Sequence, residues 1–200
     1  MKIRYIAMER QYGSGGTAIA RKAAQACGIA CYGREILERV AKDQQVSVST
    51  LETYEESVSG SLLYSMFVMS QSQTGDPDLL SGEAKLYVAE TRIIRELAAN
   101  GPAIFVGHCA ARALEQEKGV LRVFLQAEEA EKQRRIVEDY GIPEQEAAAT
   151  SRRFNHKRSQ YYAFCTGKKW NDMRNYDLVL NTTTLGEEGC VKVLQSLLTE

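Results

Sequence analysis

The stretch "ERQYGSGGTAIARKAA", Glu9–Ala24, constrains the fold more than any other part of the chain. It places three glycines and one serine, at positions 13–16, between a short apolar run and an alanine-rich stretch of helical character. A strand, a glycine turn and a helix in this order can hold a phosphate, because backbone N–H groups and the helix N-terminus point at the anion. A glycine turn of purely structural use is the alternative. We expect phosphate contacts at Gly13, Ser14, Gly15, Gly16 and Thr17.

The turn departs from the usual phosphate-binding pattern GxxxxGK[ST] at two positions. It keeps the last glycine as Gly15 and the hydroxyl as Thr17, but Arg10 replaces the first glycine and Gly16 replaces the lysine. The loss of one preorganised donor of this kind costs roughly 2.7–4 kcal/mol in a transition state. Another cation must therefore replace the lysine, and Arg10 is the nearest. Thr17 is the predicted Mg²⁺ ligand, and Glu9 is predicted to orient the water shell of the ion.

The hydrophobic pattern predicts strands that alternate with helices. Apolar runs at 3–8, 29–32, 103–106, 120–127 and 176–181 read as strands. Helical patterns cover 17–27, 34–43, 83–100, 128–140, a stretch ending near 164, and 186–198, with two further helices within 47–70 and a polar loop over 70–83. This alternation predicts a single α/β domain over residues 1–200, with a parallel sheet covered by helices on both faces.

Composition indicates a globular protein of a reducing compartment. Charged residues make up 26% and apolar residues 44% of the chain, and no stretch has the roughly eighteen apolar residues that cross a bilayer. The start "MKIRYIAM" is too short and too soon charged for a signal peptide. The five cysteines form no CxxC pair, which fits reduced thiols in the cytoplasm. We expect no membrane partner, and a homodimer is one open option.

Positive charge gathers in one segment of a nearly neutral chain. Residues 132–174 contain ten Lys and Arg against five Asp and Glu, while the whole chain has a net charge of −1. A local positive field of this kind indicates a small polyanionic ligand rather than nucleic acid, and a solvated helical face is the alternative. Guanidinium groups suit phosphoryl transfer because they stay charged and bind phosphate oxygens in pairs. The candidates are Arg134, Arg135, Arg152, Arg153 and Arg158, of which Arg152 and Arg158, with Arg10, are the preferred catalytic residues.

Several separated stretches resemble one known family, the cytidylate-kinase-like proteins. They are "ERQYGSGGTAIARKAA", "GIACYGREILERVAK", "AIFVGHCAA", "RVFLQAEEAEKQRRIVEDYGI", "YYAFCTGKKWNDMRNYDLVLNT" and "LGEEG", and the most specific is the YYxxxTGxxW…NYDLxLNT signature. A lysine-free GSGG turn is itself typical of that family. The resemblance implies a P-loop nucleoside monophosphate kinase fold, with an acceptor-binding region over 33–82 and a helical lid over 128–174.

The resemblance also assigns residues. It implies that Gly13 to Thr17 surround the donor phosphates and that Arg39 lies near the acceptor phosphate. The family's DKxR element reads "NHKR" here, so Asn155 and His156 depart from it and Arg158 is kept. His108 stands where an arginine is usual, and it can donate to a phosphate or a base or be a structural histidine. Trp170, Tyr161 and Tyr162 could stack a base, although core packing is the more common use of such residues.

Three functions are consistent with the sequence. The first is transfer of the terminal phosphoryl group of ATP, with Mg²⁺, to a nucleoside monophosphate, above all CMP or dCMP. The second keeps the P-loop transferase but changes the acceptor, because His108 and Asn155 differ from the family at the acceptor pocket. The third is a regulatory protein that binds nucleotide with little turnover, which Gly16 favours. The retained Thr17 and the arginine-rich segment favour catalysis.

Overall fold

The chain folds around a five-stranded parallel sheet. In the computed structural model, which describes residues 2–51 and 82–199, the strands are β1 (Tyr5–Arg10), β2 (Ala30–Tyr32), β3 (Ala103–Val106), β4 (Val120–Gln126) and β5 (Leu178–Asn181). Their order across the sheet is β2-β3-β1-β4-β5, and every pair is parallel. The predicted α/β class and the parallel sheet are therefore confirmed. The carboxyl ends of β1, at Arg10, and of β3, directly before Gly107, lie on the same side of the sheet because the strands are parallel.

Helices follow the strands as the hydrophobic pattern predicts. They are α1 (Gly16–Cys27), α2 (Arg34–Gln44), α5 (Gly82–Ala99), α6 (Ala110–Ala113), α7 (Glu129–Glu138), α8 (Glu144–Thr166) and α9 (Thr182–Thr199), with a 3₁₀ turn at Met173–Asn175. The helices and the loop predicted between 52 and 81 lie outside the described residues. No described helix is long and apolar enough to span a bilayer.

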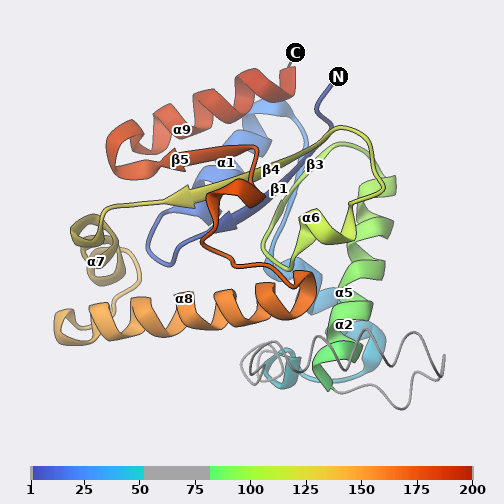
Figure 1. Ribbon diagram of the computed structural model, residues 1–200, viewed down its shortest axis with the longest axis horizontal. Helices are drawn as coiled ribbons and strands as arrows, with labels where there is room; N and C mark the ends of the chain where they lie inside the picture. Colours follow the sequence, from blue (N-terminus) through green and yellow to red (C-terminus); the bar gives the residue numbers. More distant parts are fainter. Residues whose placement is uncertain (1, 52–81, 200) are drawn as a thin grey trace.

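Alternate residues of each strand face opposite layers of helices. In β1, Ile6 and Met8 pack with residues of α1 and α9, whereas Tyr5 and Ala7 pack with α2 and α5. In β3, Ile104 and Phe105 divide in the same way. This period of two is the expected consequence of the pleat, and it produces two hydrophobic layers around one sheet. Figure 1 shows α1 and α9 side by side and α2 beside α5, away from that pair.

A third apolar cluster attaches α8 to the sheet. Phe124 of β4 is fully buried and packs against Trp170 and Tyr176, with ring centroids 5.1 and 4.9 Å apart. Tyr162 and Phe164 of α8 belong to the same cluster. The arrows of β1 and β4 in Figure 1 end on the side of the sheet where α7 follows, and α8 runs below the sheet. Aromatic packing therefore fixes α8 close to the carboxyl ends of the central strands.

Several element boundaries differ from the sequence prediction, and those of β1 and α9 have a cause in the structure. β1 begins and ends two residues later than the apolar run 3–8, because Glu9 and Arg10 continue the pairing with Phe124 and Leu125 of β4. The last helix begins at Thr182 rather than at 186, directly after β5, and Gly186 (φ 66°, ψ 171°) interrupts it. Strand pairing and local backbone geometry determine these boundaries. The hydropathy pattern carries no information about either.

We predict that Ile104→Ala lowers the free energy of unfolding by about 2–5 kcal/mol, because the side chain is fully buried and the smaller residue leaves a cavity. Denaturant unfolding measures the change. Val88→Ala is the matched control, since Val88 is 42% exposed on α5, and it should change the value by less than about 0.5 kcal/mol. Equal effects of the two substitutions would contradict the layered core.

Candidate active site

The glycine turn between β1 and α1 presents main-chain donors. Gly13 and Gly15 have left-handed φ angles of 79° and 76°, and the Ser14 hydroxyl donates to the Gln11 carbonyl at 2.8 Å. No side chain caps the N-terminus of α1. Within residues 2–51 and 82–199, the N–H groups of Gly15, Gly16 and Thr17 donate to no backbone or side-chain acceptor. Unsatisfied N–H groups at a helix N-terminus attract anions, so the turn has the geometry of a phosphate site.

Arg10 occupies the space that a side chain at position 16 would need. A Cβ atom built on Gly16 would lie 2.8 Å from Cβ of Arg10 and 3.0 Å from its Cγ. The guanidinium then extends over Gly107, where a Cβ would meet Nη1 at 2.3 Å. The path of the Arg10 side chain therefore favours glycine at position 16, whereas at position 107 the left-handed φ of 82° favours glycine and the guanidinium end can move. Arg10 stands in place of the first glycine of the usual pattern, and Gly16 stands in place of its lysine. We call this pair of linked differences the compensated exchange.

A cavity of about 460 Å³ opens beside this arginine. It lies among the carboxyl ends of β1 and β3, the start of α2, and α8. Four of its lining residues are cationic, and Glu9 is the acidic one. The lining residues are Glu9, Arg10, Arg34, Leu37, His108, Cys109, Phe154, Lys157, Arg158, Tyr161 and Tyr162. A concave site with an excess of positive charge at the carboxyl edge of a parallel sheet suits a small anionic ligand.

Arg158 of α8 faces Arg10 across this cavity. Its Nη1 donates to the Arg10 carbonyl at 2.8 Å, and its guanidinium lies 5.5 Å from the centre of the Tyr12 ring. Burial and the like charge of Arg10 lower the pKa of Arg158 to about 9, so the group still carries its charge at neutral pH. Nε of Arg10 is buried, and no described residue accepts a hydrogen bond from it. An anion between the two guanidiniums would relieve their repulsion and supply acceptors.

Glu9 is held by an aromatic residue from the other end of the chain. The indole Nε1 of Trp170 donates to Glu9 Oε2 at 3.1 Å, and both side chains are buried. Trp170 also packs edge-on against Phe124. Core packing, the more common use of such a residue, is thus what Trp170 does, while Tyr161 and Tyr162 line the cavity wall. The hydrogen bond fixes the Glu9 carboxylate at the end of β1.

His108 belongs to a buried polar group in the cavity wall. Its Nδ1 lies 2.6 Å from Oε1 of Glu90, and the Tyr161 hydroxyl donates to the other carboxylate oxygen. Glu90 is fully buried, and the His108 side chain is 8% exposed. A carboxylate that holds one ring nitrogen fixes the orientation of the imidazole. His108 therefore presents an oriented ring at the position where a flexible arginine is usual.

The segment predicted to be a lid is docked on the glycine turn. The Tyr12 N–H donates to Oδ1 of Asn155 at 2.7 Å, and the Tyr12 ring stacks on Phe154 with centroids 4.4 Å apart. Tyr140, which follows α7, packs edge-on against the same ring at 5.3 Å. Asn155, which departs from the family pattern, thus connects α8 to the turn. This contact holds Arg158, three residues further along α8, next to Arg10.

The structure brings together four of the predicted site residues and separates others. Glu9, Arg10, His108 and Arg158 line one cavity although they are far apart in sequence. Thr17 is exposed on the first turn of α1, beside the unsatisfied N–H groups. Arg39 and Arg152 are exposed on α2 and α8 and are not among the residues that line the cavity, so their predicted roles stay predictions.

Sequence reasoning missed two cations of the cavity, Arg34 and Lys157. A signal for Arg34 was present, because it opens the helix that follows β2 and therefore lies at the carboxyl edge of the sheet. Lys157 directly precedes Arg158, and its Nζ lies 5.5 Å from the centre of the Phe154 ring. That contact depends on how α8 is oriented relative to the cavity, and no sequence pattern predicts that orientation.

The described residues contain no cluster of three or more His, Cys, Asp or Glu that could bind a metal alone. Mg²⁺ in phosphoryl-transfer enzymes needs no such cluster, because nucleotide phosphates and water supply most of its ligands. The Thr17 hydroxyl, next to the turn, has the chemistry and the position for one protein ligand. Glu9 is compatible with a contact through water, since Trp170 engages its Oε2.

Strand order, the glycine turn after β1 and a cationic cavity beside it define the P-loop kinase fold. The chain belongs to the cytidylate kinase-like family, whose model matches residues 5–184. No match to the sequence was found among curated proteins. The family assignment therefore depends on a match that spans the sheet, the turn and α8.

Solved structures share the fold at low sequence identity. An uncharacterized protein from Eubacterium ventriosum has a TM-score of 0.72 at 22% identity, with 100% of this chain and 99% of that chain covered. Shikimate kinase from Bacteroides thetaiotaomicron has a TM-score of 0.55 at 14% identity, with 98% of each chain covered. A gluconokinase from Sinorhizobium meliloti has a TM-score of 0.53 at 15% identity, with 100% and 94% covered. These similarities establish the architecture.

We predict that Gly16→Ala lowers the free energy of unfolding by about 1–3 kcal/mol, because the new methyl group overlaps Arg10. In an Arg10→Gly background the same substitution should be neutral or slightly stabilising, since alanine is the better helix former. Denaturant unfolding of the four proteins gives the coupling energy.

Gly189→Ala in α9 is the matched control for this cycle, because a Cβ there meets only Cβ of Leu185 at 3.4 Å. The compensated exchange is contradicted if Gly16→Ala costs the same stability whether or not Arg10 is present.

Proposed function

We propose that the protein transfers the terminal phosphoryl group of ATP, with Mg²⁺, to a nucleoside monophosphate, with CMP or dCMP as the first acceptor to test. The observation that carries this proposal is the pair of guanidiniums, Arg10 and Arg158, that converge beside the glycine turn without an ion pair to any described carboxylate. Negative charge spreads over the oxygens of a transferring phosphoryl group, and convergent cations stabilise it. The family assignment supports the same reaction class.

The roles of the residues follow from their positions. Within the turn from Gly13 to Thr17, the unsatisfied N–H groups of Gly15, Gly16 and Thr17 hold the donor phosphates, and the Thr17 hydroxyl ligates Mg²⁺. Arg10 takes the place of the absent lysine at the end of β1. Arg158 approaches the transferring group from the opposite wall of the cavity. Mg²⁺, when bound, would neutralise part of the phosphate charge.

The acceptor side of the cavity provides further contacts. Arg34 and Lys157 add positive charge to its lining, which suits an acceptor that carries a phosphate. Leu37, Tyr161 and Tyr162 provide apolar surface for the rest of the acceptor. We propose that His108, oriented by Glu90, donates to the acceptor. Arg39 and Arg152 stay proposed contacts that require movement of an exposed side chain towards the cavity.

A different acceptor is the second candidate, and two observations favour it. His108 is fixed by Glu90 where an arginine is usual, and Asn155 is engaged with the Tyr12 N–H. Neither residue then offers the groups that the family places around a cytidine monophosphate. The fold also occurs in kinases whose names indicate small hydroxyl-bearing acceptors, shikimate and gluconate. The acceptor panel must therefore extend beyond nucleotides.

A coupled assay of ADP release tests the proposal with CMP, dCMP, UMP, AMP, GMP, shikimate and gluconate as acceptors. Turnover with CMP or dCMP supports the first candidate, and turnover with another acceptor alone supports the second. Binding of ATP without turnover on any acceptor would identify a regulatory nucleotide-binding protein. Absence of both binding and turnover would contradict the proposal.

We predict that Arg158→Ala lowers kcat by about 10²- to 10³-fold, because it removes a charged donor from the reacting centre. Arg153→Ala is the matched control, since this exposed arginine of α8 lies over the Phe154 ring, 5.3 Å from its centre, outside the cavity lining. It should retain nearly full kcat in the same assay. Similar losses in both variants would show that charge on α8, rather than its position, matters.

A further inference from the structure

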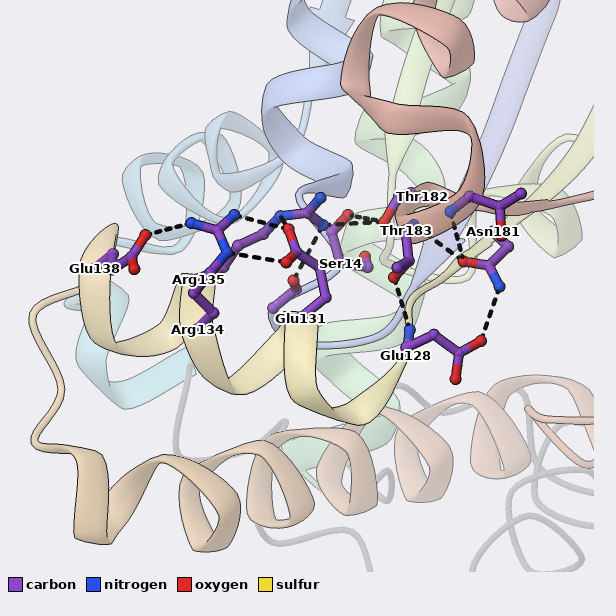
Figure 2. Close-up of polar contacts among 11 residues, drawn as sticks. Ser14, Glu128, Glu131, Arg134, Arg135, Glu138, Asn181, Thr182 and Thr183 are labelled. Carbon is purple, nitrogen blue, oxygen red and sulfur yellow. Dashed lines mark hydrogen bonds and ion pairs between the residues drawn. The ribbon is translucent and has the colours of Figure 1, made fainter.

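Three elements meet behind the glycine turn, on the side of its carbonyl groups. The Thr182 hydroxyl, at the start of α9, donates to the Ser14 carbonyl at 2.9 Å. Nη1 of Arg135, from α7, donates to that hydroxyl oxygen at 3.0 Å and lies 3.4 Å from the Gly13 carbonyl. Thr182 is fully buried, and the Arg135 side chain is 12% exposed. Figure 2 shows these groups as one chain of contacts above α7.

The direction of these hydrogen bonds determines where the turn points its donors. The C=O and N–H groups of a trans peptide unit point in opposite directions. A carbonyl of Ser14 that is held towards Thr182 therefore directs the Gly15 N–H away from Thr182, to the side where the unsatisfied donors of α1 lie. In a conventional P-loop the lysine side chain contributes to phosphate binding from within the turn, and here Gly16 contributes no side chain.

We propose that Arg135 and Thr182 are positioning residues for phosphate binding, which hold the lysine-free turn in its anion-binding conformation from outside. The inference rests on the proposed function, since it assumes that the turn binds the donor phosphates. Arg135 acts through Thr182 and the two carbonyl groups, and no contact of its own with phosphate is required. The guanidinium also lies against Gly15, where a Cβ would be 3.4 Å from Nη1.

The position of Arg135 is itself fixed by its helix. Its Nε forms an ion pair with Glu131 Oε1 at 3.0 Å, one helical turn earlier on α7. The neighbouring Arg134 differs, because its guanidinium pairs with Glu131 and Glu138 and its side chain is 48% exposed. Of the two adjacent arginines, only Arg135 contacts the glycine turn. Arg134 is therefore a matched control for Arg135.

Binding of inorganic tripolyphosphate and of Mg·ATP, measured by titration calorimetry, tests the proposal. Tripolyphosphate probes the turn without any contribution from a base. We expect Thr182→Val, which has nearly the same shape but no hydroxyl, to weaken both affinities by roughly three- to tenfold. Thr182→Ser should restore them. Arg135→Ala should weaken them at least as much, and Arg134→Ala should leave them unchanged.

Two measurements distinguish a role of Arg135 and Thr182 in folding alone from a role in positioning the turn. The double variant Arg135→Ala, Thr182→Val should lose less binding free energy than the two single variants together, because the two residues are joined by a hydrogen bond and support the same turn. All titrations are done well below the melting temperature of each variant, so that a loss of stability does not appear as a loss of affinity. Arg135→Ala carries the test if Thr182→Val does not fold.

The inference is overturned if wild-type protein binds the probes and the Thr182→Val and Arg135→Ala variants bind them equally well. Additive losses in the double variant would also overturn it, because they would indicate two independent effects. If wild-type protein binds neither tripolyphosphate nor Mg·ATP, the proposed function itself fails. The two failures are therefore distinguishable.

Discussion

The site depends on the contact between Arg10 and Gly16. Arg10 leaves the end of β1 and passes so close to position 16 that a Cβ atom there would be 2.8 Å from its own Cβ. The guanidinium of the same side chain lies over Gly107, which follows β3. A lysine at position 16 beside this arginine at position 10 would require the backbone to shift, because the two Cβ atoms would otherwise be 2.8 Å apart. The chain thus carries its cation on the strand, where it faces the cavity, and leaves the turn with main-chain donors only.

In the proposed function, this arrangement divides the work of the conventional lysine between two places. Charge comes from Arg10 and from Arg158, which α8 presents across the cavity. The conformation of the turn is supported from its carbonyl side, by Thr182 and Arg135. Both contributions require α7 and α8 to be docked, and Tyr12 provides the docking surface through Asn155, Phe154 and Tyr140. The segment predicted to be a lid therefore contacts the glycine turn directly.

The sequence predicted the architecture well, because strands and helices leave periodic traces. It also singled out Glu9, Arg10, His108 and Arg158, which the structure places around one cavity, since strand ends and family motifs mark these positions. It could not decide which arginine of a helix faces the cavity. Arg34 lines the cavity and Arg39 does not, and positions five residues apart on a helix are separated by about 140°.

The same geometry explains the other arginines. Arg134 and Arg135 are adjacent, yet about 100° separates them around α7, so one meets glutamates at the surface and the other meets the turn. The use of Thr182 was also out of reach of the sequence, because it depends on β5 ending next to Ser14. These roles depend on contacts between elements that are distant in sequence. Such contacts cannot be predicted from the residue pattern of a single sequence.

The central claim, that main-chain donors of a lysine-free turn hold the triphosphate, is tested most directly by amide NMR. In ¹⁵N-labelled protein titrated with Mg·ATP, the account predicts saturable shifts of the Gly15, Gly16 and Thr17 amide signals, larger than those of amides on the far edge of the sheet. Saturable binding of Mg·ATP with these three signals unmoved would contradict it.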